Sequence, residues 1–213
     1  MLNNTVIRLI LVVLITVFSF QKIEAQSTLK QFFKLPHPEK CWVMTHPFKA
    51  KRALKISKEA RQKADSIANT PTLNGDKNGG QVDAFRHSYW QARLTQTIGK
   101  RASYKLGKAH EKGNYIYYKR HKLEDGTIPD KISTDMDLFN NSVGIGVTSE
   151  NKNLSKTEIE TILISKIKNG YLRIIAKDKN GNFLDCNGNI IDKNNLKGKW
   201  ENNKCLVKSN QKP

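Results

Sequence analysis

Residues 81–98, with the sequence QVDAFRHSYWQARLTQTI, form the strongest predicted helix of the chain. Gly99 follows directly and is a typical residue just beyond a helix C-terminus. Before this helix, apolar residues recur at steps of three and four over residues 48–68, which predicts a second helix with a Lys-rich outer face. The Pro- and Gly-containing residues 69–80 are predicted to be the loop that joins the two helices.

Three further helices are predicted after Gly99. They are residues 100–111, a helix from Asp135 with Thr134 as its N-cap, and a helix behind the capping box Ser155–Glu158 that ends at Gly170. The pair Gly113-Asn114 is expected to end the first of these helices. The glycines at positions 144 and 146 are expected to weaken the second.

The end of the chain favours short strands. Residues 171–176 (YLRIIA) read as a strand, Asn180-Gly181 as a hairpin turn, and Phe183-Leu184 as the returning strand. From Lys193 onward, we expect a loose polar tail.

These elements predict a mainly α fold, a compact helical domain with a small C-terminal β-hairpin. Residues 48–176 would be the helical domain, and residues 177–213 a Gly/Asn-rich hairpin and tail. Residues 26–47 are predicted to be irregular, because three prolines interrupt them.

The composition sets limits on the class of protein. The 213 residues include 37 Lys and Arg against 19 Asp and Glu, a net charge of +18, with 38% hydrophobic residues. These values exclude a multi-span membrane protein, a collagen-like chain and a long coiled coil. The charge suits anionic lipid or polysaccharide as a partner. Because 29 of the basic residues are Lys and only 8 are Arg, nucleic acid is a less favoured partner. Codon bias alone is an alternative source of so much Lys.

Residues 1–25 are predicted to be a signal peptide. The apolar run Leu9–Phe20 has twelve residues, fewer than the roughly 20 needed to span a bilayer. Cleavage after Ala25 would leave no transmembrane anchor and would place the protein in the periplasm or outside the cell. An uncleaved N-terminal anchor is the alternative.

For an exported chain, Cys186 and Cys205 are the expected disulfide pair, with Cys41 left over. Three free thiols are the alternative.

The residues suited to chemistry gather in three segments, DAFRHSYW (83–90), AHE (109–111) and MDLFNNSVG (136–144). Asp83 and His87 are four residues apart and share one helix face. We expect His87 to act as a base that Asp83 orients, with His110 and Glu111 as further acid–base groups.

Two other roles are predicted for the same segments. Arg86, Trp90, Asn140 and Asn141 are predicted to bind substrate, and Gly144 to allow a close approach of a backbone or ligand. If the helices pack side by side, a divalent metal such as zinc has four candidate ligands, which are His87, His110, Glu111 and Asp137. Purely structural pairing of these residues is the alternative.

The same three segments, in this order, resemble an uncharacterised bacterial domain family. Its pattern is Asp-Ala-x-Arg-His-x-x-Trp, then Ala-His-Glu, then Met-Asp-Leu-x-Asn-Asn-x-x-Gly, and it matches about residues 79–175. The family occurs in small exported proteins and near the C-termini of large RHS-type or phage-related proteins. The resemblance implies a mostly helical domain and brings no established activity.

The leading hypothesis from the sequence is an exported hydrolase-like domain that acts on an anionic ester, such as a phospholipid or phosphodiester. The second is a non-enzymatic cell-envelope module that binds anionic lipid or polysaccharide. A toxin-like effector is the third, suggested by the large secreted proteins that carry the family pattern.

Overall fold

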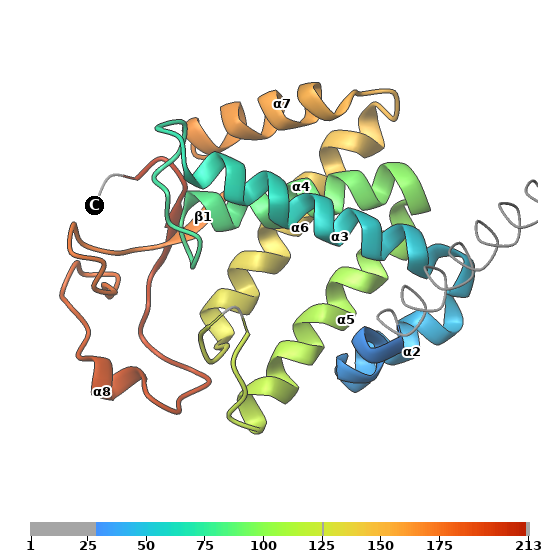
Figure 1. Ribbon diagram of the computed structural model, residues 1–213. Helices are drawn as coiled ribbons and strands as arrows, with labels where there is room; N and C mark the ends of the chain where they lie inside the picture. Colours follow the sequence, from blue (N-terminus) through green and yellow to red (C-terminus); the bar gives the residue numbers. More distant parts are fainter. Residues whose placement is uncertain (1–28, 125, 212–213) are drawn as a thin grey trace, which may run out of the picture.

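The computed structural model describes residues 29–124 and 126–211, and it is mainly helical with one two-stranded antiparallel sheet near the C-terminus (Figure 1). The predicted fold class is therefore confirmed. The predicted signal peptide lies outside the described residues. Within the described part of the chain, no helix has both the length and the apolar character needed to cross a membrane.

The helix α4 (Gln81–Ile98) is the centre of the fold, with the bounds that the sequence predicts. It contacts α3 (Pro47–Ala68), α5 (Lys100–Lys119), α6 (Lys131–Glu150) and α7 (Lys156–Lys168). Ala84, Phe85, Tyr89 and Leu94 of α4 have no exposed surface. A helix buried on several faces is held mainly by tertiary packing, and α4 positions the polar residues that it carries.

The helices α3 and α7 cover α4 from outside, as their apolar stripes predict. The stripe of α3 is rich in alanine, and Ala53, Ala60 and Ala64 are each at most 4% exposed. Small side chains let the α3 backbone lie close to α4. The predicted capping box of α7 is confirmed, because Ser155 and Glu158 exchange hydrogen bonds between side chain and backbone.

The prediction that residues 26–47 are irregular was wrong for most of this segment. Residues 29–34 are helical, and a further helix, α2, spans His37–Thr45. Pro36 is the N-cap of α2 and Pro38 lies in its first turn. Proline is tolerated at these positions because the first N–H groups of a helix have no partner within it.

Two predicted helix boundaries were also wrong. The helix α5 continues through Gly113 to Lys119, and α6 starts at Lys131 rather than Asp135. A Cβ at Gly113 would lie 2.5 Å from Cγ of Pro36, so this glycine serves helix packing rather than chain termination. The N-cap of α6 is Asp130, which accepts a hydrogen bond from the Ser133 backbone N–H, 2.8 Å away.

The C-terminal strands pair differently from the prediction. The strand β1 (Arg173–Ile175) pairs antiparallel with β2 (Leu206–Lys208), not with Phe183-Leu184, which form only isolated bridges. The segment from Lys193 is therefore not a loose tail. It includes the short helix α8 (Lys193–Leu196), and Ser209 is fully buried.

The predicted disulfide Cys186–Cys205 is confirmed, and Cys41 is free and exposed. In Figure 1 the segment after β1 lies on the opposite side of the helical body from α2.

Candidate active site beside a pocket

A buried polar cluster lies between α4 and α6. The face of α4 that carries Asp83 and His87 meets Asp137 of α6, and all three residues are at most 6% exposed. Gly144 makes this meeting possible, because a Cβ there would lie 2.0 Å from the backbone oxygen of Ser88. The predicted close approach at Gly144 is thus a backbone contact, one residue along α4 from His87.

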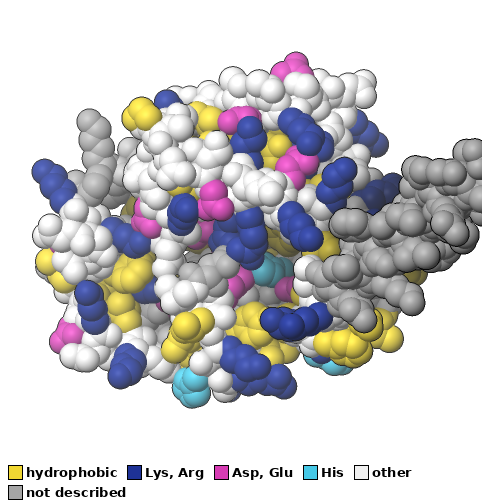
Figure 2. Space-filling view, in the orientation of Figure 1, with side chains coloured by type: hydrophobic (Ala, Val, Ile, Leu, Met, Phe, Trp, Pro, Cys, Tyr) yellow, Lys and Arg dark blue, Asp and Glu magenta, His cyan; other side chains and the backbone are white. Residues whose placement is uncertain are grey.

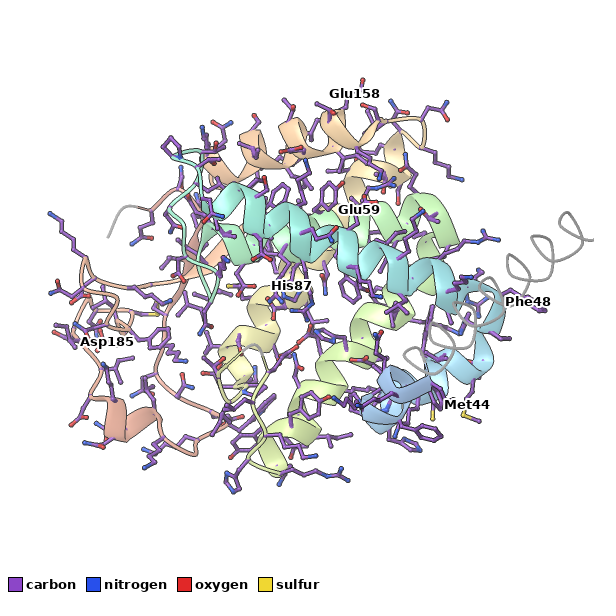
Figure 3. All side chains as sticks on the ribbon, viewed as in Figure 1. Met44, Phe48, Glu59, His87, Glu158 and Asp185 are labelled. Atoms are coloured by element: carbon purple, nitrogen blue, oxygen red, sulfur yellow. A yellow bond between two sulfur atoms is a disulfide. The ribbon has the colours of Figure 1, made fainter. Side chains whose placement is uncertain are left out.

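The side chain of His87 lies in the interior of the helical body (Figure 3) and is surrounded by charged groups. Its Nε2 atom lies 3.0 Å from Nη2 of Arg86, 3.4 Å from Oδ1 of Asp137 and 3.6 Å from Oδ1 of Asp83. Arginine can only donate hydrogen bonds, so Nε2 accepts and the hydrogen of the neutral ring sits on Nδ1. A proton taken up at Nε2 would lie beside two carboxyl groups.

The pKa values of the cluster favour a neutral His87. Burial lowers the pKa of His87 well below 6.5, and the Arg86 guanidinium adds to the effect, while Asn141 acts in the opposite direction. Burial raises the pKa of Asp137 well above its usual range, and the neighbouring Glu111 and Asp83 carboxyls raise it further. Burial also raises the pKa of Asp83, although Arg86 opposes this effect from 2.6 Å.

His110 lies near the cluster but forms ion pairs with residues outside it. Its Nδ1 is 2.8 Å from Oε1 of Glu39, and its Nε2 is 2.9 Å from Oε1 of Glu124. Burial lowers its pKa, but the bonds to Glu124 and Glu39 outweigh burial and hold the pKa well above 6.5. His110 is therefore an imidazolium that links α5 to α2 and to the loop before α6.

The carboxyl groups in and around the cluster outnumber its cations. Asp83, Glu111 and Asp137 belong to the cluster and Glu39 and Glu124 lie against His110, whereas the positive charges are those of Arg61, Arg86 and His110. Burying a net negative charge is costly, so the cluster retains a proton on its carboxyl groups. Consistently, burial raises the pKa of Glu111 to about 7 against the opposing effect of His110. Such a proton can exchange with His87 during a reaction.

The four predicted metal ligands are not brought together as one set. Among the described residues, the group whose ligand atoms lie within 4.8 Å of one another is Asp83, His87 and Asp137. Their 3.4 and 3.6 Å separations are close to the roughly 3.3 Å expected between ligands of a tetrahedral zinc. However, Nη2 of Arg86 lies 2.6 Å from Asp83 and 3.0 Å from His87, so a metal would have to displace a guanidinium.

The predicted substrate-binding residues separate into two pairs. Arg86 and Trp90 line a pocket, and Trp90 donates a hydrogen bond to Oγ of Ser57. Asn140 instead bonds the backbone N–H and carbonyl of Arg173, each at 2.9 Å, and so fixes β1 to α6. Asn141 is buried in the cluster near His87, whose pKa it raises, but its amide atoms fall short of the geometry of a hydrogen bond to any described residue.

The sequence reasoning missed Gln91, whose amide is also buried without a partner in the described part of the chain. Gln91 and Asn141 border a cavity of about 20 Å³, which is large enough for one water molecule. The sequence spacing could have indicated Gln91, because Asp83, His87 and Gln91 follow at steps of four along one face of α4.

A larger pocket of about 250 Å³ includes His87 in its lining. Most of its lining comes from α2, α3, α4 and α5. The lining includes His87, Arg86 and His110, and most of the other lining side chains are apolar. Figure 2 shows a hollow near the centre of this face, with a histidine inside it and Lys and Arg side chains around it. A small molecule in this pocket would thus contact His87, Arg86 and His110.

The raised pKa of Glu111 has a consequence for stability. The pKa of Glu111 is about 7 in the folded protein, against an ordinary 4.5. Its contribution to the free energy of unfolding is therefore complete below pH 4.5 and is lost as the pH rises through about 7. We expect the free energy of unfolding of Glu111→Gln to fall less between pH 5 and pH 8 than that of the wild type, by on the order of 2 kcal/mol. Urea denaturation at both pH values measures this. The exposed Glu201→Gln serves as control, and an unchanged pH slope in Glu111→Gln would contradict the assignment.

Comparison with known proteins gives a family but no activity. No curated protein and no solved structure matches the chain significantly. A family model described as "Domain of unknown function (DUF6973)" matches residues 40–171 and so includes α3 and most of α2, which the sequence pattern of residues 79–175 left out. With well over half of its length matched, the chain belongs to the DUF6973 family.

Proposed function

We propose that the protein hydrolyses an ester that has an apolar chain and an anionic group, with His87 as the general base. One observation carries the proposal. A buried, neutral imidazole with two carboxyl groups beside its Nε2 lies against a pocket with apolar walls. A histidine beside a pocket, next to carboxyl groups and with a shifted pKa, is an arrangement typical of functional sites.

The reaction would follow from the positions of these groups. The Arg86 guanidinium moves from Nε2 of His87 to the carbonyl oxygen of the ester, and Nε2 then takes a proton from a water molecule, whose oxygen attacks the carbonyl carbon. Asp137 and Asp83 stabilise the imidazolium that forms. The Arg86 guanidinium, which lines the pocket, stabilises the negative charge on the carbonyl oxygen. The bond to the leaving alcohol then breaks, and the alcohol takes the proton from His87.

The proposed reaction uses no metal, because Arg86 already supplies the positive charge next to Asp83 and His87. Zinc bound by Asp83, His87 and Asp137 is the rival arrangement. In that case, EDTA would abolish activity and added Zn²⁺ would restore it. Activity that is unaffected by EDTA supports the arrangement with Arg86.

The experiment is a hydrolysis assay of the purified protein with 4-nitrophenyl esters and single-chain anionic glycerophosphate esters of increasing chain length. We expect release of the acid above a heat-denatured blank. The active His87 is neutral and its pKa is lowered, so activity is expected to persist below pH 6.5 and to be lost only as the pH falls further. A half-maximal rate at or above pH 6.5, or no hydrolysis of any ester, would end the proposal.

A binding module for anionic lipid is the second candidate, and one feature favours it. Met44 and Phe48 are 70% and 89% exposed at the outer corner between α2 and α3 (Figure 3), on a chain with a net charge of +18. Exposed apolar side chains together with positive charge suit a lipid surface. Sedimentation with phosphatidylglycerol vesicles tests it. Binding that is lost in Phe48→Ser and kept in His87→Ala, in a protein without esterase activity, would favour the module.

Export also stands as a proposal, and the Cys186–Cys205 disulfide supports it, since disulfides persist mainly in oxidising compartments. N-terminal sequencing of the protein from culture fractions tests export. A periplasmic or secreted product that begins at Gln26 is the expected result.

A further inference from the structure

The pocket beside His87 changes from apolar to polar along its length. On α3 its lining begins with Ala50, Ala53 and Leu54 and continues with Ser57, Ala60 and Arg61. These positions span twelve residues of helix, or about 16 Å. Arg61 acts on the pKa of His87 through its charge, so the polar end of this gradient is the end that holds His87.

The other walls follow the same gradient. Trp42 of α2 and Leu106 of α5 are buried in the apolar cluster that also contains Ala53. Glu39, an acidic residue of the lining, is bonded to the His110 imidazolium, as Arg86 is to Asp83. At the polar end the guanidinium groups of Arg61 and Arg86 are lining groups that can donate charge-assisted hydrogen bonds to an anion.

The size of the pocket limits its ligand. At about 250 Å³ it is smaller than the roughly 300–1,000 Å³ of a typical small-molecule site. A ligand with two long chains would not fit inside. A single chain of moderate length, extended along α3, matches both the length and the apolar lining.

We infer that the pocket binds one hydrocarbon chain that ends in an anionic group, with the chain toward α2 and the anion at Arg61 and Arg86. As a statement about the substrate, this inference rests on the proposed hydrolysis; as a statement about binding, it is tested separately. The anion could be the carboxylate of a fatty acid or the phosphate of a lipid headgroup. Both offer oxygen acceptors that suit a guanidinium.

The test is isothermal titration calorimetry with sodium decanoate, decyl phosphate, decanol and sodium butyrate. Decanoate is expected to bind at least about tenfold more tightly than butyrate, because its six additional CH₂ groups become buried. Tighter binding of decyl phosphate than of decanoate would identify a phosphate headgroup as the anion, and the reverse would identify a fatty acid. Equal affinities for decanoate and butyrate would overturn the inference.

Two pairs of variants locate the ligand. Ala50→Phe fills the apolar end and is expected to weaken decanoate binding at least about tenfold, whereas Gln62→Phe, on an exposed position of the same helix, is expected to leave it unchanged. Arg61→Gln should weaken decanoate about tenfold and spare decanol. Arg52→Gln should affect neither, because Arg52 is exposed like Arg61 but does not line the pocket. Decanoate binding that survives in a folded Ala50→Phe would overturn the inference.

A measurement on the wild type does not depend on the folding of any variant. A decanoate analogue with a diazirine at the chain terminus is expected to label residues 42–54 upon irradiation, and labelling confined to other segments would contradict the inference. His87→Gln separates the two proposals. It should bind decanoate and lose hydrolysis. If the wild type binds decanoate but hydrolyses no ester, the proposed function is wrong and the inference about the pocket stands. If the wild type hydrolyses esters at a rate that does not depend on chain length, the inference is wrong and the proposed function stands.

Discussion

Replacing His87 with glutamine is expected to lower kcat/KM for ester hydrolysis by at least about 10³-fold while the fold is kept. A positioned general base contributes about 10²–10⁴-fold, and two carboxyl groups that stabilise the imidazolium place His87 toward the upper end of that range. Glutamine has a similar length and can accept the hydrogen bond of Arg86. The loss should therefore reflect the base rather than a collapse of the buried cluster.

The control for this variant is His37→Gln, the same substitution at an exposed position of α2. It should retain full activity and the same melting temperature as the wild type. Asp137→Asn adds a second comparison, because it removes a carboxyl group 3.4 Å from Nε2 and keeps the shape of the side chain. If the His87→Gln protein is folded and hydrolyses esters as fast as the wild type, His87 is not the general base of the reaction.

The core of this site could be predicted from the sequence, since Asp83 and His87 share a helix face and Asp137 belongs to the same pattern of segments. The partners of His110 could not be predicted. Glu39 lies 71 residues away, in a segment that the prolines made look irregular. The role of His110 thus depends on tertiary contacts that local spacing does not contain. The pocket was missed for the same reason, because much of its lining lies before residue 79.

The fold shows the same division between local and long-range information. The apolar stripes of α3 and α7 and the whole of α4 were predicted, because periodic burial is a local signal. The errors fell on Gly, Pro, the N-cap of α6 and strand pairing. Gly113 reads as a helix end until Pro36 is placed against it. The partner of β1 lies about 30 residues further along the chain, beyond nearer segments with turn signals.

Gly144→Ala is expected to lower the free energy of unfolding by about 3 kcal/mol or more. The added Cβ would lie 2.0 Å from the backbone oxygen of Ser88, and backbone cannot move aside as a flexible side chain can. Intrinsic helix propensity predicts the opposite sign, because alanine is about 1 kcal/mol more favourable than glycine within a helix. The variant therefore separates packing from propensity in urea denaturation.

Gly146→Ala is the matched control, two residues further along α6. A Cβ there would meet no atom within 4 Å, so propensity alone should act and stability should rise by up to about 1 kcal/mol. If α6 is forced away from α4 in Gly144→Ala, Asp137 also moves away from His87, and any folded fraction should have reduced esterase activity. Equal stabilities of the two variants would mean that α4 and α6 do not meet at Ser88, and the link between this contact and the site would fail.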